Sequence, residues 1–372
     1  MKCLIVVPSL IRAGAETQAV DLANGLSASG HEVHLCCFDD ELDQRSRLSS
    51  EVRFHHVRRN SKYDWDLTRR LAKVIDEHRI EVVQGVLLFA CLVAWLATKR
   101  SHRKPPVVAA VHTTQNRGRK QEIQERLLYA HMLRRLPAVI FVCAHQRDHW
   151  IRKYPSLKSR ARLVYNGMDA ARFRREDWES AAGSLRATLD IPRDAIVFTC
   201  VAAFRPEKGH EILLEAFAKG PANAYLILAG DGERRAATET LGRARGLQGR
   251  LRFLGNVPDV RPAIVASNAT VLASTAVETF SMAMLESMAL GVPMIAPRIG
   301  GLSEAIVDRM NGRLIPVGGT EALAECFRDL AEDPRAWRQM GQAAHDAVVA
   351  SFTLEQMVLS NEAVLRDVHE RR

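Results

Sequence analysis

Two glutamates separated by seven residues, Glu278 and Glu286, are the most informative pair of ionisable side chains in the sequence. The segment from Met282 to Leu290 is apolar on nearly every side, which predicts a buried helix that carries Glu286 inside it. A buried carboxylate is costly unless it has a partner. An internal arginine or the hydroxyl groups of a ligand would each satisfy it, and this segment alone leaves both interpretations open.

The start of this helix, predicted over 281–290, is suited to binding an anion. Free N–H groups near Ser281, Met282 and Ala283 favour a phosphate at the helix N-terminus. Glu278 precedes them, and Glu286 lies about 7 Å further along the helix. The sugar, diphosphate and ribose of a nucleotide sugar fit this order of groups.

A cationic loop is the second element that indicates chemistry. A loop that contains Pro206 and Gly209 joins a predicted strand to a helix. This loop also carries Arg205 and Lys208. These cations are placed to meet a diphosphate near the helix start. Alone, the segment also fits an ordinary surface loop, whereas together with the acidic pair it predicts a charge-matched site in one domain.

Two residues of the first half follow predicted strands. Gly14 allows the backbone to approach a phosphate at a helix start, although a plain turn explains it equally well. His112 follows an apolar strand, so its imidazole lies at the mouth of a sheet, in a functional or a structural role. Gly230 and Gly232 resemble part of a dinucleotide-binding motif, but Arg235 occupies its third glycine position, so NAD binding is poorly supported.

Short apolar runs alternate with longer helical patterns along the chain, which predicts an α/β fold with parallel sheets covered on both faces. Strands are predicted at 2–7, 32–37, 52–57, 81–84, 106–111, 138–143, 195–201, 225–229, 251–254, 269–273 and 292–296. Helices are predicted at 15–28, 66–78, 121–135, 211–218, 281–290 and 334–349. The apolar stretch 82–98 is too short for a membrane span of about 20 residues and is interpreted as a buried strand and helix.

Length and composition agree with two doubly wound domains. The chain has 372 residues, of which 47% are apolar and 26% charged, so disorder is excluded as its main state. We place the domains at 1–175 and 176–372, with a polar linker over 172–184, and expect a last helix at about 353–369 to pack back on the first domain. Seven cysteines without a C-x-x-C pattern indicate reduced core residues in a cytosolic protein, and the apolar run after Met1 is too short for a signal peptide.

The charge is divided unequally between the two halves. Residues 1–175 hold 31 Lys and Arg against 17 Asp and Glu, a net +14, whereas residues 176–372 hold 21 against 26, a net −5. Such asymmetry suggests a polyanionic substrate or an anionic membrane surface. The densest basic clusters are 99–104 and 117–120. Aromatic residues do not interleave with them, so nucleic acid is the least favoured partner and none is expected.

These motifs resemble those of the retaining nucleotide-sugar glycosyltransferases of family 4, which have the GT-B fold of two Rossmann-like domains facing across a cleft. The resemblance covers nearly the whole chain, and its most specific motif is the pair Glu278 and Glu286. The other matching segments are 13–16, His112, 166–169, 206–209, 230–233, 253–257, and Gly300-Gly301 with Glu304.

The resemblance implies a role for each residue of the site. Glu278 contacts the transferred sugar, Glu286 the ribose hydroxyls and Lys208 the diphosphate, while Gly14 approaches the phosphates from the opposite domain and His112 a sugar hydroxyl near the reacting carbon. Further substrate contacts are expected from Phe280, Ser281, Met282, Ala283, Asn256 and Val257.

The sequence departs from the family pattern at three places. Ala13 replaces the first glycine of a Gly-Gly pair, and Thr279 and Ser281 replace the two glycines of Glu-Gly-Phe-Gly. The phosphate-binding arginine of the family aligns with Ala203. We expect Arg205, two residues away, to take over that catalytic role.

The resemblance implies glycosyl transfer from a nucleoside diphosphate sugar to a hydroxyl of a glycan or lipid-linked acceptor, with retention, in cell-envelope polysaccharide or lipopolysaccharide synthesis. No metal or other cofactor is expected, since no Asp-x-Asp motif is placed for a metal and the leaving diphosphate accepts the acceptor's proton. We expect a cytoplasmic protein, peripheral on the inner face of the membrane. A nucleotide-sugar epimerase, a phosphorylase and a non-catalytic membrane-associated scaffold remain alternatives.

Overall fold

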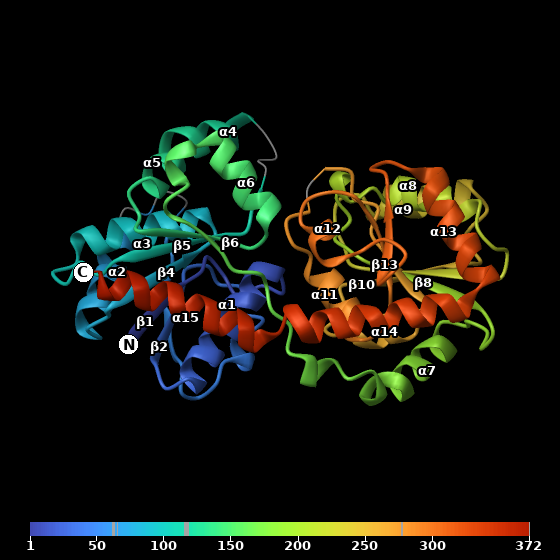
Figure 1. The fold of residues 1–372 in the computed structure, drawn as a ribbon, viewed down its shortest axis with the longest axis horizontal. Helices are drawn as coiled ribbons and strands as arrows, with labels where there is room; N and C mark the ends of the chain where they lie inside the picture. Colours follow the sequence, from blue (N-terminus) through green and yellow to red (C-terminus); the bar gives the residue numbers. More distant parts are fainter. Residues whose placement is uncertain (62–63, 65, 115–118, 277, 372) are drawn as a thin grey trace. The chain divides into compact units, whose positions relative to one another are not determined.

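The computed structural model describes residues 1–372 except 62–63, 65, 115–118, 277 and 372 (Figure 1). It divides into a first unit, Met1–Gly167 with Leu354–Arg372, and a second unit, Met168–Thr353. The boundary after Gly167 precedes the position 175 placed from sequence.

The last helix, α15 (Leu354–Glu370), belongs to the first unit, where it packs on α1 (Gly14–Ala28). Gly25 permits this packing, because a Cβ there would lie 2.3 Å from a methyl group of Val358.

The first unit is a seven-stranded parallel sheet with helices on both faces. In spatial order the strands are β3 (Arg53–His56), β2 (Glu32–Cys37), β1 (Lys2–Val6), β4 (Val82–Val86), β5 (Val107–Val111), β6 (Ala138–Phe141) and β7 (Ala161–Leu163). The other helices are α2 (Leu67–Glu77), α3 (Leu88–Arg100), α4 (Arg119–Gln124), the π-helical turn η2 (Glu125–Tyr129), α5 (Ala130–Leu133) and α6 (Ala144–Lys153). Alternating strand residues enter two cores, one against α1 and α15 and the other against α2, α3, α5 and α6.

The second unit is a six-stranded parallel sheet. Its strands are β10 (Leu251–Gly255), β9 (Ala224–Ala229), β8 (Ile196–Val201), β11 (Ala269–Val271), β12 (Met294–Pro297) and β13 (Gly312–Ile315). Its helices are α7 (Glu179–Thr188), α8 (His210–Ala218), α9 (Arg235–Ala244), α10 (Arg261–Val265), α11 (Met282–Ala289), α12 (Leu302–Ala305), α13 (Thr320–Glu332) and α14 (Pro334–Ser351), with 3-10 turns including η4 (Ala170–Phe173), η5 (Arg175–Trp178) and η6 (Pro206–Lys208).

The α/β prediction is confirmed. Each predicted strand and helix is present, although the helix predicted over 121–135 is divided into α4, η2 and α5. Strands β7 and β13 were not predicted, because both are short edge strands that include an arginine, Arg162 and Arg313, and lack an apolar run. The linker predicted over 172–184 is wrong in character, since η5 and the start of α7 lie within it. The stretch 82–98 forms β4 and most of α3, and no helix among the described residues has both the length and the apolar character needed to cross a membrane.

The strand order fixes where a ligand can bind in each unit. Chain connections leave the central strands in opposite directions, at β1 and β4 in the first sheet and at β8 and β11 in the second. The loops beyond the carboxyl ends of two such strands separate and leave a crevice between them. The loops after β8 and β11 carry Lys208 and Glu278.

The cysteines and the Asp-x-Asp spacing also have structural explanations. All seven cysteines are buried and free, as predicted, and burial raises the pKa of Cys91 and Cys200 to about 12.

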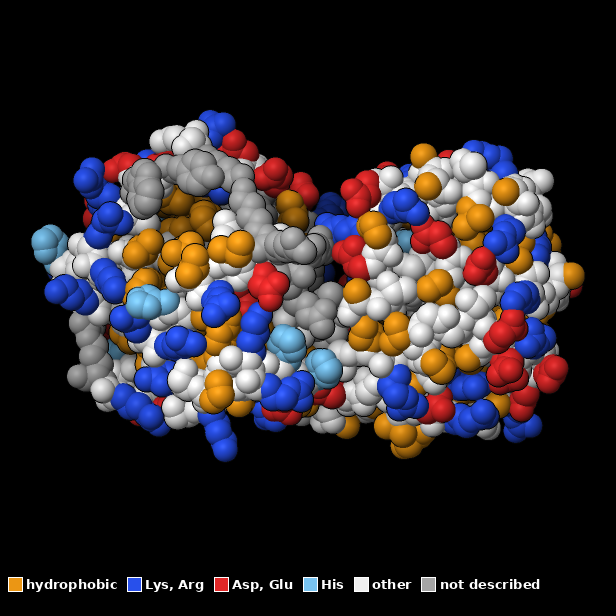
Figure 2. Space-filling model, turned by 90° about the horizontal axis from the view of Figure 1, so that it is seen from above, with side chains coloured by type: hydrophobic (Ala, Val, Ile, Leu, Met, Phe, Trp, Pro, Cys, Tyr) orange, Lys and Arg blue, Asp and Glu red, His pale blue; other side chains and the backbone are white. Residues whose placement is uncertain are grey.

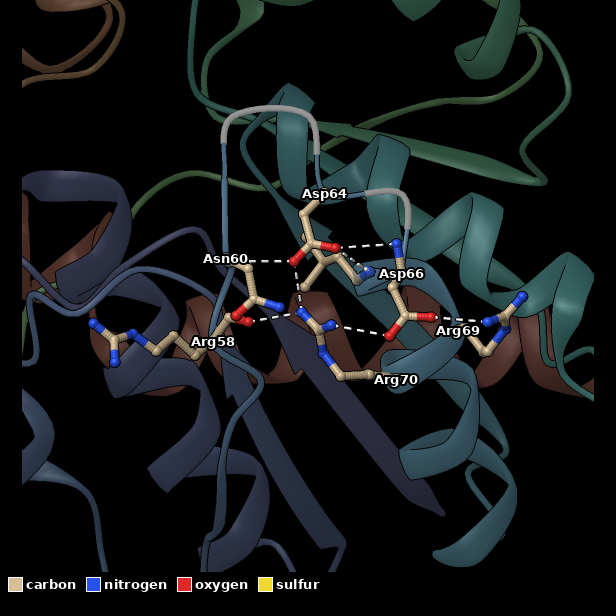
Figure 3. A network of polar contacts seen from close by, with 7 residues as sticks. Arg58, Asn60, Asp64, Asp66, Arg69 and Arg70 are labelled. Carbon is tan, nitrogen blue, oxygen red and sulfur yellow. Dashed lines mark hydrogen bonds and ion pairs between the residues drawn. The ribbon is translucent and has the colours of Figure 1, made fainter.

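Asp64 and Asp66 have the spacing of a metal-binding motif, but both carboxylates pair with Arg70, at 2.7 and 3.0 Å (Figure 3). Hydrogen bonds from the Asn60 backbone and from Arg70 lower the pKa of Asp64 to about 2. This network anchors the start of α2.

Candidate active site

A partly buried ion pair lies at the switch point of the second sheet. Glu278 Oε1 is 2.5 Å from Lys208 Nζ, and the same oxygen accepts a hydrogen bond from Ser274 Oγ at 2.5 Å. Glu278 is 7% exposed, whereas the Lys208 side chain is 21% exposed. The carboxylate is therefore satisfied inside the protein, while the ammonium group remains within reach of a ligand.

Two glycines hold the loops that carry this pair. Gly300 has φ +59°, and a Cβ there would lie 1.5 Å from the carbonyl oxygen of Glu278. Gly209, with φ +64°, would place a Cβ 2.1 Å from the carbonyl oxygen of Ala273. No side chain fits at either position, because the backbone it meets cannot move away as a flexible side chain would.

The glycines of the incomplete dinucleotide motif also allow close backbone contacts, here between the loops after β8 and β9. Gly230 and Gly232 have positive φ values, and Cβ atoms there would lie 2.1 Å from the Ala202 oxygen and 2.6 Å from the Phe204 oxygen. The Phe204 N–H donates to the Asp231 oxygen at 2.9 Å. These glycines therefore join two loops, which accounts for them without a dinucleotide.

Helix α11 presents its N-terminus beside the ion pair. Ser281 is its N-cap, and the Ser281 oxygen accepts a hydrogen bond from the Met284 N–H at 3.4 Å. N–H groups of the first turn lack partners within the helix and are suited to an anion. Phe280, just before the cap, is 4% exposed and packs on Phe352 with ring centroids 5.3 Å apart, so its side chain supports the loop.

The prediction that α11 is buried on all sides is wrong. Met282, Ala283 and Glu286 are half-buried and share one face, because residues three and four apart on a helix are neighbours. The packed face consists of Met284, Leu285, Ser287, Met288 and Ala289. The fully buried carboxylate of this segment is thus Glu278, and Glu286 lies on the more open side of the helix.

The other predicted residues of the second unit are more exposed. Arg205 is exposed at the N-cap of η6, and no side chain of a described residue pairs with its guanidinium. Asn256 is exposed and Val257 half-buried, in the loop after β10. The structure thus brings Lys208 and Glu278 into contact but does not bring Arg205 to that pair.

In the first unit, His112 follows β5 and borders a small cavity. The cavity has a volume of about 20 Å³. Its polar lining residues are Gln18, Gln84, Asn166 and Asn361, and the others are mostly apolar. Burial lowers the pKa of His112 to about 4. The imidazole is therefore neutral near pH 7, with one nitrogen able to donate a hydrogen bond and the other able to accept one.

Gly14 opens helix α1 in the loop after β1, with Ala13 in extended conformation at the N-cap. The sequence analysis assigned no role to Glu16 in the first turn, yet this carboxylate is only 5% exposed and burial raises its pKa. Its place in the segment 13–16, which matches the family pattern, was the available signal.

Two family models match successive parts of the chain. Residues 12–172 match the model described as Glycosyltransferase Family 4, and residues 183–347 match Glycosyl transferases group 1. An N-acetyl-alpha-D-glucosaminyl L-malate synthase of Bacillus anthracis is 25% identical over 366 residues, which is 95% of this chain and 94% of that protein. A lipopolysaccharide core biosynthesis glycosyltransferase of Rhizobium meliloti is 34% identical over 170 residues, which is 46% of this chain and 49% of that protein.

Solved structures resemble the whole chain. The Anabaena protein HepE, solved with UDP and glucose, has a TM-score of 0.87 at 20% identity, with 98% of this chain and 99% of that chain covered. WaaG, described as a glycosyltransferase involved in lipopolysaccharide biosynthesis, has a TM-score of 0.74 at 16% identity, with 98% of each chain covered. With the two parallel-sheet units, these likenesses show the GT-B fold.

Proposed function

Since the chain belongs to the family 4 glycosyltransferases, we propose that it transfers a sugar from a nucleoside diphosphate sugar to a hydroxyl group of a glycan or lipid-linked acceptor, with retention of the anomeric configuration. The observation that carries the proposal is the contact of Lys208 with buried Glu278 at the switch point of the second sheet. The UDP present in the HepE structure and the lipopolysaccharide role of the Rhizobium relative support the donor and acceptor classes.

Leaving-group stabilisation is the main task of this site. Lys208 and the N–H groups at the start of α11 are fixed before the donor binds, so they stabilise the charge that develops on the diphosphate without rearranging. Each such donor is worth about 2.7–4 kcal/mol in the transition state. Arg205, unpaired among the described side chains, supplies further positive charge once its flexible side chain turns to the diphosphate.

The carboxylates orient the donor. Among the described residues, Lys208 and Ser274 both contact Oε1 of Glu278, so Oε2 is available to accept a hydrogen bond from a hydroxyl of the transferred sugar. Glu286, on the open side of α11, accepts hydrogen bonds from the ribose hydroxyls. The departing diphosphate accepts the proton of the attacking hydroxyl.

The test is a nucleotide-release assay with UDP, GDP and ADP sugars, each with and without envelope glycan or lipid-linked acceptors. We expect release that depends on acceptor, is unchanged by EDTA and is lost in Lys208→Met, with a product of the donor's anomeric configuration. Equal turnover without an acceptor would favour an epimerase or hydrolase. Phosphate-dependent cleavage would favour a phosphorylase, and no binding of any nucleotide sugar would favour a scaffold.

The basic first unit favours an acceptor at an anionic membrane. Lys99, Arg103 and Lys104 are exposed, and Lys99 lies over the Trp95 ring at 3.6 Å. The second basic cluster, 117–120, begins outside the described residues. Basic and hydrophobic side chains lie side by side on the face of the first unit drawn in Figure 2, and three exposed apolar residues follow the second cluster: Ile123, Leu127 and Leu128.

Co-sedimentation with liposomes tests this part of the proposal. Each Lys or Arg near an anionic leaflet contributes about 1 kcal/mol, and this attraction weakens as the Debye length falls from about 10 Å at 0.1 M salt to about 3 Å at 1 M. We expect binding to anionic but not zwitterionic liposomes, lost at high salt and weakened in Arg103→Glu/Lys104→Glu. Equal binding to both liposome types, or to neither, would favour a soluble acceptor.

A further inference from the structure

Three histidines converge on one face of the first unit's sheet, apart from the residues assigned to sugar transfer. They are His34 on β2, His55 on β3 and His78 at the C-cap of α2. Each offers one ring nitrogen, and the three nitrogens lie within 4.8 Å of one another. We propose that these histidines bind one divalent transition-metal ion of the Zn²⁺ type.

The donor set selects this class of ion. Imidazole nitrogen suits Zn²⁺, Ni²⁺ and Cu²⁺, whereas Mg²⁺ and Ca²⁺ require oxygen ligands. A histidine binds metal in its neutral form. Burial lowers the pKa of His34, whose side chain is fully buried, and lowers that of His55 to about 4. At neutral pH both rings are therefore already in the form that coordinates metal.

The rings need only a small adjustment to surround an ion. His34 Nδ1 and His55 Nε2 are 2.8 Å apart, and their ring planes are within 2° of parallel. The His78 ring lies 4.7 Å and 4.8 Å from the other two, measured between centroids. Tetrahedral bonds of about 2.0–2.1 Å place ligand nitrogens about 3.3 Å apart. His55 and His78 are half-buried, so their side chains have more freedom to rotate toward that spacing than the fully buried His34.

Glu32 supplies the outer partner that a metal-binding histidine commonly has. Its Oε1 lies 3.4 Å from His34 Nε2, so it can accept the ring proton there, which leaves His34 Nδ1 to accept the 2.8 Å hydrogen bond from His55 Nε2. When the ion binds, the His55 proton moves to the other nitrogen of that ring, and both facing nitrogens then offer lone pairs to the ion. Lys2 and Arg53 hold this carboxylate at 2.9 Å and 3.0 Å. The positive charges of Lys2 and Arg53 are thus paired with Glu32.

The ion would act on stability rather than on the reaction. β3 is a four-residue strand at the edge of the sheet, and a metal bound by all three histidines would tie it to β2 and to the end of α2. His34 and His55 lie within strands, not in the loops beyond the strands' carboxyl ends where ligands of such sheets bind.

The experiment uses the full chain without an affinity tag, stripped of metal by a chelator and titrated with Zn²⁺ by calorimetry. We expect one Zn²⁺ per chain and, at about 100 times its Kd, a rise in the Tm of about 5 °C or more. His55→Gln and His78→Gln should each weaken binding at least tenfold, whereas His102→Gln, exposed in the same unit, should not change it.

A spectrum separates coordination from surface binding. Co²⁺ in place of Zn²⁺ should give the intense visible absorption of a four-coordinate site, and His78→Gln should remove it. Zn²⁺ binding below one per chain, or binding that persists unchanged in His55→Gln and His78→Gln, would overturn the proposal. Because glycosyl transfer is not measured, failure of this site and failure of the proposed function are distinguishable.

Discussion

In the second unit, the loops beyond the central strands carry a partly buried ion pair, whereas the corresponding edge of the first unit carries the neutral His112 beside a small cavity. Both sheets have the same order of strands about their switch points. In the second unit, Gly209 and Gly300 allow contacts between backbones that would exclude any Cβ. Topology therefore provides the crevice, and side chains together with glycine packing decide which unit holds a charged ligand.

The largest expected effect comes from breaking the ion pair. Lys208→Met should lower kcat by about 10²–10³-fold, because one fixed donor to the leaving group is lost. His112→Gln in the first unit should lower kcat only about tenfold, since its neutral ring contributes a weaker hydrogen bond. Steady-state kinetics of both variants measure the difference, and equal losses would remove the distinction between the units.

The same substitution leaves Glu278 buried without its cation, so loss of structure must be separated from loss of chemistry. Lys208→Met/Glu278→Gln removes both charges and should recover the thermal stability that Lys208→Met loses. We expect this double variant to be folded by circular dichroism and inactive. Recovered activity would show that the pair is structural.

Arg205→Ala tests whether Arg205 takes over the role of the family arginine that aligns with Ala203. We expect kcat to fall by about 10²-fold, as it does when a charge donor in the transition state is lost. Arg193→Ala is a matched control, since Arg193 is an exposed arginine of the same unit outside the candidate site. A decrease below about threefold for Arg205→Ala would mean that another group supplies the charge missing at Ala203.

Glu286→Ala should weaken donor binding by about 1.5–3 kcal/mol, the range for hydrogen bonds to a charged group, with little change in the Tm. The half-buried position of Glu286 predicts this separation of affinity from stability. Calorimetry with the donor and a thermal melt measure the two quantities. A large loss of Tm with unchanged donor affinity would make Glu286 a structural residue.

Gly300→Ala tests the backbone contact between Gly300 and Glu278, with Gly318→Ala as its control. Both glycines have positive φ, at +59° and +74°, but only Gly300 would place a Cβ against the Glu278 oxygen, whereas Gly318 faces open space. Gly318→Ala should cost about 1 kcal/mol of stability, and Gly300→Ala more, with about tenfold lower activity. Equal effects would mean that the contact with Glu278 does not matter.

Acid should weaken the first unit before the second. In the first unit, burial lowers the pKa of His34, His55 and His112, the last two to about 4. In the second unit, burial lowers the pKa of His210 to about 4. More of these histidines therefore take up a proton on unfolding in the first unit. The unfolded chain binds these protons near pH 6.5, so the stability is complete above about pH 6.5 and is lost as pH falls toward about 4.

Hydrogen exchange resolved by peptide measures this difference at about pH 7, 6 and 5, with a chelator present and with correction for intrinsic exchange rates. Peptides of the first unit should lose protection first. Simultaneous loss in both units, or earlier loss in the second, would contradict the assignment of these histidines as neutral in the folded protein at pH 7.

Much of the fold followed from apolar runs, because strands buried on both faces leave a strong pattern. Short edge strands such as β13 left none. Glu278 and Lys208 were found as separate motifs, but their contact was not predicted, since it depends on how two loops pack 70 residues apart in the chain. Gly300 illustrates the same limit, because its role depends on the Glu278 backbone it touches.

The most direct test of the central claim is peptide-resolved hydrogen exchange of the full chain with and without a nucleotide sugar. The site built on Lys208 and Glu278 predicts protection in 202–209 and 278–286, and this protection should be absent in Lys208→Met/Glu278→Gln. Protection confined to the loops after β1 and β5 of the first unit, with none at 202–209 or 278–286, would contradict the account.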